Sequence, residues 1–219
     1  MSDTSSRARA VVIGSVFLLA LALWLPGPVA AFDEGIDYER LERPLSTIDA
    51  DAAIRVTEIF WYGCPHCDRI RGPLADWSDG LADDVQVEHM PVVFDRRVEP
   101  HARAYYAAEV LGIEDETHAG VFDAIHREGR SLNTEHAVAD FFTDYGVDAD
   151  EAEQTLGSFG VATKLRRARS VTRRAGIEGV PAFVVAGEFT TSLSQAGSTE
   201  RLFEVLDYLI EKARNERAG

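Results

Sequence analysis

The alternation of hydrophobic and polar positions predicts interleaved strands and helices after residue 31. Residues 54–62 are rich in β-branched and aromatic side chains, which is typical of a buried strand. The apolar residues after this segment recur every three or four positions, as on one face of an amphipathic helix: Ile70, Leu74, Trp77 and Leu81. Further strands are predicted at 38–44, 85–94, 182–186 and 189–191. A final helix is expected to bury a stripe made of Leu202, Val205, Leu206, Leu209 and Ile210.

Residues 98–175 are predicted to be mostly helical. Glycines at 112, 129, 146 and within 157–160 suit helix C-termini. The intervals between them predict helices that begin near His101, Thr117, Thr134 and Asp148, and a further helix over 161–175. The segments show no self-similarity, so we expect an α/β fold with one helical insertion rather than a repeat array.

The first 31 residues read as a secretory signal peptide. Arg7 and Arg9 precede an apolar run over 10–25, about 16 residues long, whereas a membrane-spanning helix needs roughly 20. Small residues before Phe32 suit cleavage by a signal peptidase. A cleaved chain would work in an oxidising compartment such as the periplasm, and an uncleaved membrane anchor is the alternative.

The charge of the chain argues against two classes of partner. Of 219 residues, 37 are acidic and 22 basic, which gives a formal net charge of −15. Nucleic acids and anionic membrane surfaces are therefore not expected as general partners. One segment departs from this pattern, because six positive charges fall within residues 164–174: Lys164, Arg166, Arg167, Arg169, Arg173 and Arg174. This stretch is either a solvated helix face or a contact for an acidic partner or lipid headgroups.

The chain has two cysteines, which sit together as Cys64-Pro65-His66-Cys67. A structural zinc site normally needs a second ligand pair, and the sequence offers none with suitable spacing. A c-type haem needs a histidine after the second cysteine, where this chain has Asp68. A purely structural disulfide closing so short a loop would stabilise the fold by only ~2 kcal/mol. The strand before the motif and the helix after it favour a redox-active dithiol, with no metal or organic cofactor.

The position of the motif predicts unequal thiols. Pro65 suits the first position of a helix, which makes Cys64 the N-cap residue. Free backbone N–H groups and the positive end of the helix dipole would then lower the pKa of Cys64 below the ordinary ~8.5. His66 adds a donor or a positive charge, unless it is merely a solvated loop histidine. Cys67, farther into the helix, is expected to be the less exposed, resolving cysteine.

These residues resemble the DsbA-type family of thioredoxin-fold oxidases, whose active-site helix also opens with Cys-Pro-His-Cys. Residues 179–183 (Gly-Val-Pro-Ala-Phe) resemble the family's cis-proline loop, which faces the dithiol. The resemblance covers nearly all of 38–213. It implies a thioredoxin-like domain, a central mixed sheet flanked by helices, made of 32–97 and 176–219, with an inserted helical domain at 98–175. It also implies that Val180, next to Pro181, offers backbone hydrogen bonds to an extended substrate peptide.

The resemblance also assigns a role to a carboxylate. Glu58 shares a strand face with Val56 and Phe60, so we expect it to be buried. In the family, a glutamate at the matching place lies beneath the dithiol and helps to move the proton of the resolving cysteine, which implies this role for Glu58. The alternative is a plain solvated or paired strand carboxylate. Family members often carry a lysine near that glutamate on the next strand. This chain has His89 there, and the resemblance assigns His89 no role.

The activity that the resemblance implies is the introduction of disulfide bonds into exported proteins by dithiol–disulfide exchange. A monomer would take unfolded or reduced proteins into an apolar groove around Pro65, Val180 and Pro181. A quinone-linked membrane protein of the DsbB type would reoxidise it. The alternatives are a disulfide reductase or isomerase on the same fold, or a peptide-binding chaperone with incidental thiols. The dimeric isomerases carry an additional N-terminal domain, and we expect none in residues 32–53.

Overall fold

Five strands form one mixed β-sheet. The structure, a computed structural model, describes residues 32–45 and 54–219, so the predicted signal peptide lies outside the described residues. The strands stand in the order β1-β5-β4-β2-β3: β1 (Glu39–Arg40), β2 (Ile54–Phe60), β3 (Val85–Pro91), β4 (Ala182–Val185) and β5 (Phe189–Ser192). Strands β2 and β3 are parallel, whereas β4 is antiparallel to both β2 and β5. The register sets Glu58 of β2 beside His89 of β3 and Phe183 of β4.

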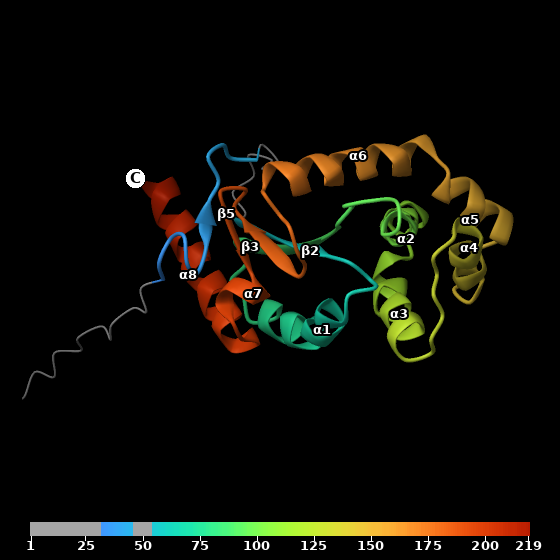
Figure 1. Ribbon diagram of the computed structural model, residues 1–219, viewed down its shortest axis with the longest axis horizontal. Helices are drawn as coiled ribbons and strands as arrows, with labels where there is room; N and C mark the ends of the chain where they lie inside the picture. Colours follow the sequence, from blue (N-terminus) through green and yellow to red (C-terminus); the bar gives the residue numbers. More distant parts are fainter. Residues whose placement is uncertain (1–31, 46–53) are drawn as a thin grey trace, which may run out of the picture. The chain divides into compact units, whose positions relative to one another are not determined.

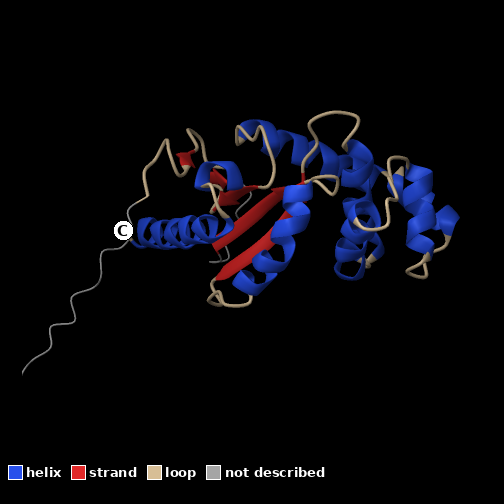
Figure 2. Cartoon of the chain, turned by 60° about the horizontal axis from the view of Figure 1, so that its bottom comes forward, coloured by secondary structure: helices blue, strands red, loops and turns tan. Residues whose placement is uncertain are grey.

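Two long helices cover one face of this sheet. Helix α1 (Pro65–Ser78) follows β2, and α8 (Thr199–Ala218) ends the chain after the short α7 (Leu193–Ala196). In Figure 2 the helix that ends at the C-terminus, α8, lies beside the strands. The apolar stripes of both helices meet the sheet in one buried cluster that includes Leu74, Phe183 and Leu206. Burial of such side chains stabilises the fold by roughly 1.5–3 kcal/mol each and fixes α1, with the cysteines at its N-terminus, on the sheet.

Five helices lie between β3 and β4 in the chain, as the glycine spacing predicts: α2 (Glu99–Leu111), α3 (Glu114–His126), α4 (Glu135–Thr143), α5 (Ala149–Leu156) and α6 (Phe159–Arg174). Helices α2 to α5 gather beyond the end of β2, and α6 runs back from them toward the sheet (Figure 1). A second buried cluster joins these helices to the sheet and includes Phe60, Phe122 and Leu165. The architecture is therefore an α/β thioredoxin fold with a helical insertion. No helix in the described ranges is long and apolar enough to cross a bilayer.

Several predicted strand and helix limits differ from the structure. Strand β3 stops at Pro91 rather than at residue 94, because its partner β2 ends at Phe60 and offers no further ladder. The predicted strand over 38–44 is reduced to the two residues of β1, and α1 ends before Leu81. Helix α2 begins at Glu99, ahead of the predicted His101.

Two other helices also begin earlier than the sequence predicts. Helix α3 begins at Glu114 rather than near Thr117, because three acidic residues occupy its first turn, where the helix dipole favours negative charge. Helix α6 begins at Phe159 rather than at residue 161. The reason is that Ser158 Oγ accepts a hydrogen bond from Val161 N at 3.2 Å, which caps the helix and leaves Gly160 in the first turn.

Candidate active site

The two cysteines occupy the turn between β2 and α1, as the motif predicts. Cys64 is the N-cap of α1, and Pro65 is the first helical residue. The backbone N–H of Cys64 donates to Trp61 O at 2.9 Å, which holds the turn in place. Both thiols are free, and Cys64 is 7% exposed whereas Cys67 is 1% exposed. In the described ranges, no group of three or more His, Cys, Asp or Glu side chains could hold a metal ion.

The two thiols have opposite pKa shifts. A hydrogen bond from the Cys67 thiol, backbone N–H groups of Cys67 and His66, and the charge of His66 together lower the pKa of Cys64 to about 6, although burial opposes them. The hydrogen bond to Cys64, burial and the negative charge of Glu58 raise the pKa of Cys67. Cys64 is therefore the thiolate at neutral pH, and Cys67 keeps its proton.

The loop before β4 faces the Cys64 sulfur. The Val180–Pro181 peptide bond is cis, as the resemblance to the family's cis-proline loop implies. The Cys64 sulfur lies 3.5 Å from the carbonyl oxygen of Val180, to which the thiol form of Cys64 can donate. A cavity of about 580 Å³ opens beside this contact, lined by residues that include His66, Val180, Pro181 and Leu193. Pro65 is exposed and is not among the lining residues of this cavity.

His66 lies on the exposed side of the motif. The guanidinium of Arg69 donates from Nη2 to His66 Nδ1 at 2.7 Å, one turn along α1. In the neutral ring Nδ1 accepts this bond, so the second ring nitrogen carries the proton that His66 can donate. His66 is part of the cysteine turn and also lines the cavity beside Pro181.

Glu58 is buried beneath the cysteine turn, 4% exposed, as its position on β2 predicts. Its Oε2 lies 2.8 Å from Nδ1 of His89, the neighbouring residue on β3. Burial opposes a charge on His89, but the hydrogen bond and the charge of Glu58 outweigh it, so the pKa of His89 is raised. Glu58, His89 and Cys67 line one cavity of about 210 Å³, together with Arg71.

A second histidine, which the sequence reasoning missed, completes this cavity. The ring of His118 stacks on that of His89, with centroids 4.8 Å apart and planes at 27°. His118 Nδ1 lies 3.0 Å from the hydroxyl of Tyr62. Burial, followed by the charges of His89 and Arg71, lowers the pKa of His118 to about 3, so this ring stays neutral. The four-residue interval from His118 to Phe122 was a signal that both share one face of α3.

Known proteins share this sequence and this fold. Residues 55–207 match the family model of the DSBA-like thioredoxin domain. The chain is 36% identical over 162 residues to the thiol:disulfide interchange protein DsbA of Azotobacter vinelandii, which covers 74% of this chain and 76% of the relative. It is 31% identical over 206 residues to the protein of the same name from Pseudomonas aeruginosa, covering 94% and 97%.

Solved structures agree with these sequence relatives. The crystal structure of Pseudomonas aeruginosa DsbA matches with a TM-score of 0.80 and 32% identity, covering 86% of this chain and 97% of that chain. That of the Xylella fastidiosa oxidoreductase DsbA matches with a TM-score of 0.79 and 31% identity, covering 84% and 98%. Residues 55–207, which match the family model, contain the cysteine turn, the proline loop and the helical insertion. The chain thus belongs to the DSBA-like thioredoxin domain family and is a thiol:disulfide oxidoreductase.

Proposed function

We propose that this chain introduces disulfide bonds into exported proteins through Cys64 and Cys67. The observation that carries the proposal is the contrast between the two thiols: Cys64 is at the helix N-cap with a lowered pKa, and the more deeply buried Cys67 has a raised pKa. A stabilised Cys64 thiolate favours the reduced form of the pair, which makes the disulfide a strong oxidant. The same relation between thiolate stability and oxidising power is established for DsbA.

The exchange takes two steps. A substrate thiolate attacks Cys64 Sγ in the disulfide form, the Cys64–Cys67 bond breaks, and Cys67 leaves and takes up a proton. A second substrate thiolate then attacks the substrate sulfur of the mixed disulfide, and Cys64 leaves as a thiolate. Two electrons pass from the substrate dithiol to the enzyme, and the substrate gains its disulfide.

Glu58 serves the first step in this proposal. Cys67 must gain a proton on reduction and lose it on reoxidation, although it is 1% exposed. Glu58 and His89 line the same cavity as Cys67 and are hydrogen-bonded to each other at 2.8 Å. A carboxylate that faces the cavity can pass this proton between the thiol and the water that the cavity has room for.

Substrate chains would bind beside the proline loop. The backbone of Val180 is close enough to the Cys64 sulfur to pair with an extended peptide whose cysteine reacts there. His66, Val180, Pro181 and Leu193 line the adjoining cavity, which gives a mixed apolar and polar surface. Such a surface fits reduced, unfolded polypeptides with little sequence preference at the cysteine itself.

The setting of the reaction is also part of this proposal. Residues 1–31 would direct the chain to the periplasm, where it would act as a monomer. Its partners would be reduced exported proteins and a DsbB-type, quinone-linked membrane protein that reoxidises Cys64 and Cys67. Residues 32–97 and 176–219 would form the thioredoxin-like domain, with 98–175 as its helical insertion.

The test is the equilibrium of the cysteine pair with glutathione buffers. We expect a reduction potential well above that of the glutathione couple, together with rapid oxidation of a reduced substrate protein. A potential as low as that of thioredoxin would contradict the oxidase and favour a reductase. A Cys64→Ser variant separates the enzyme from a chaperone, because the oxidase loses all activity whereas a peptide-binding chaperone keeps its function.

A further inference from the structure

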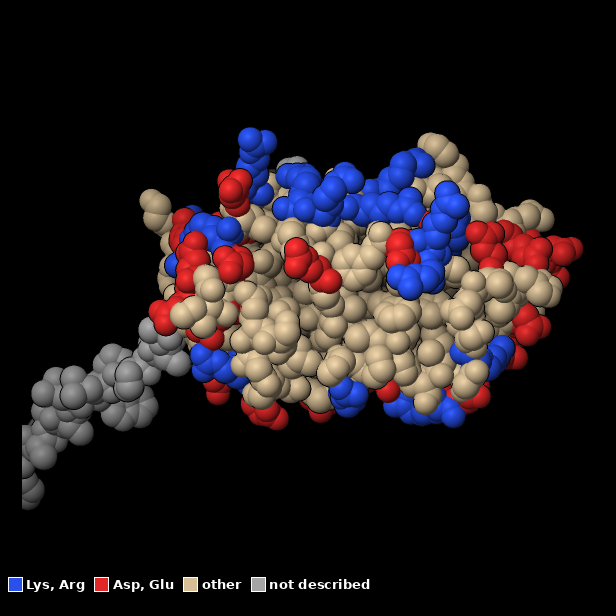
Figure 3. Space-filling view, in the orientation of Figure 1, with Lys and Arg blue, Asp and Glu red and all other residues tan. Residues whose placement is uncertain are grey.

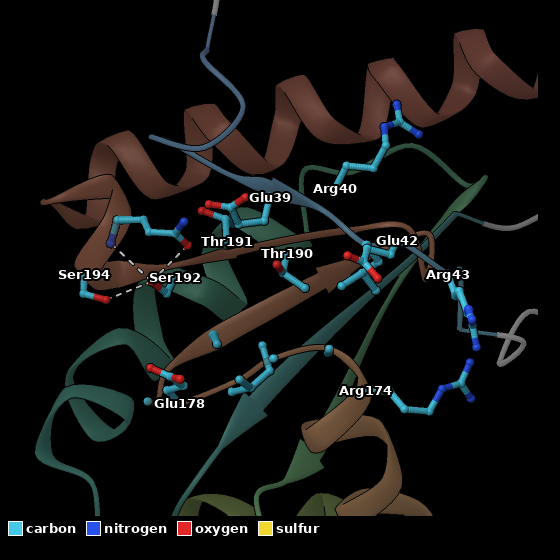
Figure 4. A pocket seen from close by; sticks show the side chains of 17 residues that line it. Glu39, Arg40, Glu42, Arg43, Arg174, Glu178, Thr190, Thr191, Ser192 and Ser194 are labelled. Atoms are coloured by element: carbon cyan, nitrogen blue, oxygen red, sulfur yellow. Dashed lines mark hydrogen bonds between the residues drawn. The ribbon is translucent and has the colours of Figure 1, made fainter.

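The cavity beside Pro181, called the substrate cavity, continues into a second and larger cavity. Gly179 and Ser194 line both of them, so the surface runs without a break from the proline loop to the far end of the second cavity. The second cavity measures about 960 Å³ and lies between β5, the segment 39–43 and the end of α6. Figure 4 shows Ser194 and Glu178 at one end of it and Arg43 and Arg174 at the other.

The two arginines form an unusual end to this cavity. Arg174 Nη2 donates to the carbonyl of Pro44 at 3.3 Å, which holds its guanidinium beside the residue that follows Arg43. Figure 4 shows the two guanidinium groups pointing toward one another. Within residues 32–45 and 54–219, neither of them has a carboxylate within ion-pair distance. Most other arginines of this acidic chain do have one, for example Arg201 with Asp37 at 2.6 Å.

The surrounding charges reinforce this end of the cavity. Arg174 closes α6, a helix with no acidic residue, whose six basic residues begin at Lys164. Figure 3 shows the basic side chains gathered along this helix, in contrast to the acidic groups elsewhere on the same face. Two of the six are neutralised, Lys164 by Glu109 and Arg169 by Glu99. Arg173 and Arg174, at the end of α6 that borders the cavity, have no carboxylate partner among the residues that the structure describes.

We propose that this cavity binds the part of a substrate polypeptide beyond its reacting cysteine, and that Arg43 and Arg174 bind a carboxylate of that segment. The inference rests on the proposed function, because it extends the substrate site of the same reaction. Two guanidiniums that face each other without an acidic partner offer several N–H donors to a carboxylate. Glu39, Glu42 and Glu178 also line this cavity and disfavour a carboxylate beside them, so the charge of the substrate is directed to the end where Arg43 and Arg174 meet.

The experiment uses peptides with one cysteine and a single glutamate, moved one position at a time along either side of the cysteine. The oxidised protein reacts with each peptide under single-turnover conditions, and a matched peptide carries glutamine in place of glutamate. We expect one window of positions in which glutamate raises the second-order rate constant about three- to tenfold over glutamine. Peptides with a free or an amidated C-terminus show whether a terminal carboxylate fills the same place.

Two variants decide the assignment. The paired change of Arg43→Gln and Arg174→Gln is expected to abolish the preference for glutamate, so that the glutamate and glutamine peptides of each matched pair react at equal rates. Arg173→Gln is the matched control, because Arg173 is exposed and adjacent on α6 but does not line the cavity. A glutamate preference that survives the paired change, or that no peptide shows, overturns this inference. If the unaltered protein reacts with none of the peptides, the proposed function fails instead.

Discussion

Glu58 Oε2 lies 2.8 Å from His89 Nδ1 in a cavity that also reaches Cys67. The two residues face each other because β2 and β3 are parallel and their register pairs them directly. A buried carboxylate is costly unless a neighbour stabilises its charge. His89 gives that stabilisation only while it is protonated, so the pair beneath the resolving cysteine depends on pH in a way that a lysine partner would not.

The His89→Gln variant tests this dependence through stability. Because the pKa of His89 is raised above its ordinary 6.5, charged His89 stabilises the folded state fully below that value. The contribution is lost as the pH rises through the raised pKa. We therefore expect His89→Gln to lower the free energy of unfolding by about 1 kcal/mol below pH 6.5 and by clearly less in mildly alkaline buffer. Denaturant unfolding of the oxidised protein measures both values.

The control for this change is His136→Gln. His136 also has a raised pKa, caused first by its hydrogen bond with Glu153 at 2.8 Å, but its side chain is 87% exposed. Surface ion pairs contribute little, so this variant should unfold nearly like the unaltered protein at every pH. An equal loss for His89→Gln at acidic and alkaline pH would show that the imidazole charge does not matter.

Glu58→Gln should slow the steps in which Cys67 gains or loses its proton. The carboxylate is the acidic group in the cavity that Cys67 shares, and its loss removes both a proton carrier and a negative charge that raises the Cys67 pKa. We expect reoxidation of the reduced protein to slow about tenfold or more. We also expect the Cys67 thiol to titrate at a lower pH. Stopped-flow fluorescence and thiol titration measure the two effects.

Glu88→Gln is the matched control for Glu58. Glu88 is next to His89 on β3, but its side chain pairs with Arg55 at 3.4 Å and with Thr57 at 2.7 Å, outside the cavity. Its substitution should leave the rate of reoxidation unchanged. If Glu88→Gln slows the reaction as much as Glu58→Gln, the effect comes from the general negative charge of β2 and β3 and not from a proton carrier.

The cysteine variants should differ sharply in reactivity. Cys67→Ser keeps Cys64 at the N-cap and should form a stable mixed disulfide with glutathione, since no second thiol can displace it. Cys64→Ser leaves only Cys67, which is 1% exposed and whose pKa is still raised by burial and by the charge of Glu58, so it should remain largely unmodified. Mass spectrometry after incubation with oxidised glutathione distinguishes them. Ready modification of Cys67 in the absence of Cys64 would contradict its assignment as the resolving thiol.

The parts of this site that the sequence predicts are those set by neighbours in the chain. The turn that makes Cys64 an N-cap is predicted by its close neighbours in the chain, which are a strand and a glycine before it and Pro65 after it. Alternation along β2 predicts the burial of Glu58, because a strand has only two faces. The position of His89 beside it follows once β3 is aligned as the parallel neighbour of β2.

The parts that the sequence leaves open depend on how distant elements pack. His118 reaches the cavity because α3 lies beside Phe60 and Tyr62, and no local pattern gives the position of an inserted helix. The meeting of Arg43 with Arg174 likewise needs the segment before β2 to reach the end of α6. The sequence pattern places two helix starts too late, because α2 already begins at Glu99 and the N-cap Ser158 lets α6 begin at Phe159.

The pH dependence of the reduction potential tests the two thiols together. Below the Cys64 pKa of about 6, reduction of the disulfide takes up two protons with two electrons, so the potential should fall by about 59 mV per pH unit. Above it, Cys64 stays a thiolate while Cys67 still takes a proton, so the slope should halve to about 30 mV per pH unit. Glutathione equilibria at several pH values locate the break. A single slope through neutral pH, with a break only near the ordinary thiol pKa of about 8.5, would mean that the helix N-terminus does not stabilise the Cys64 thiolate.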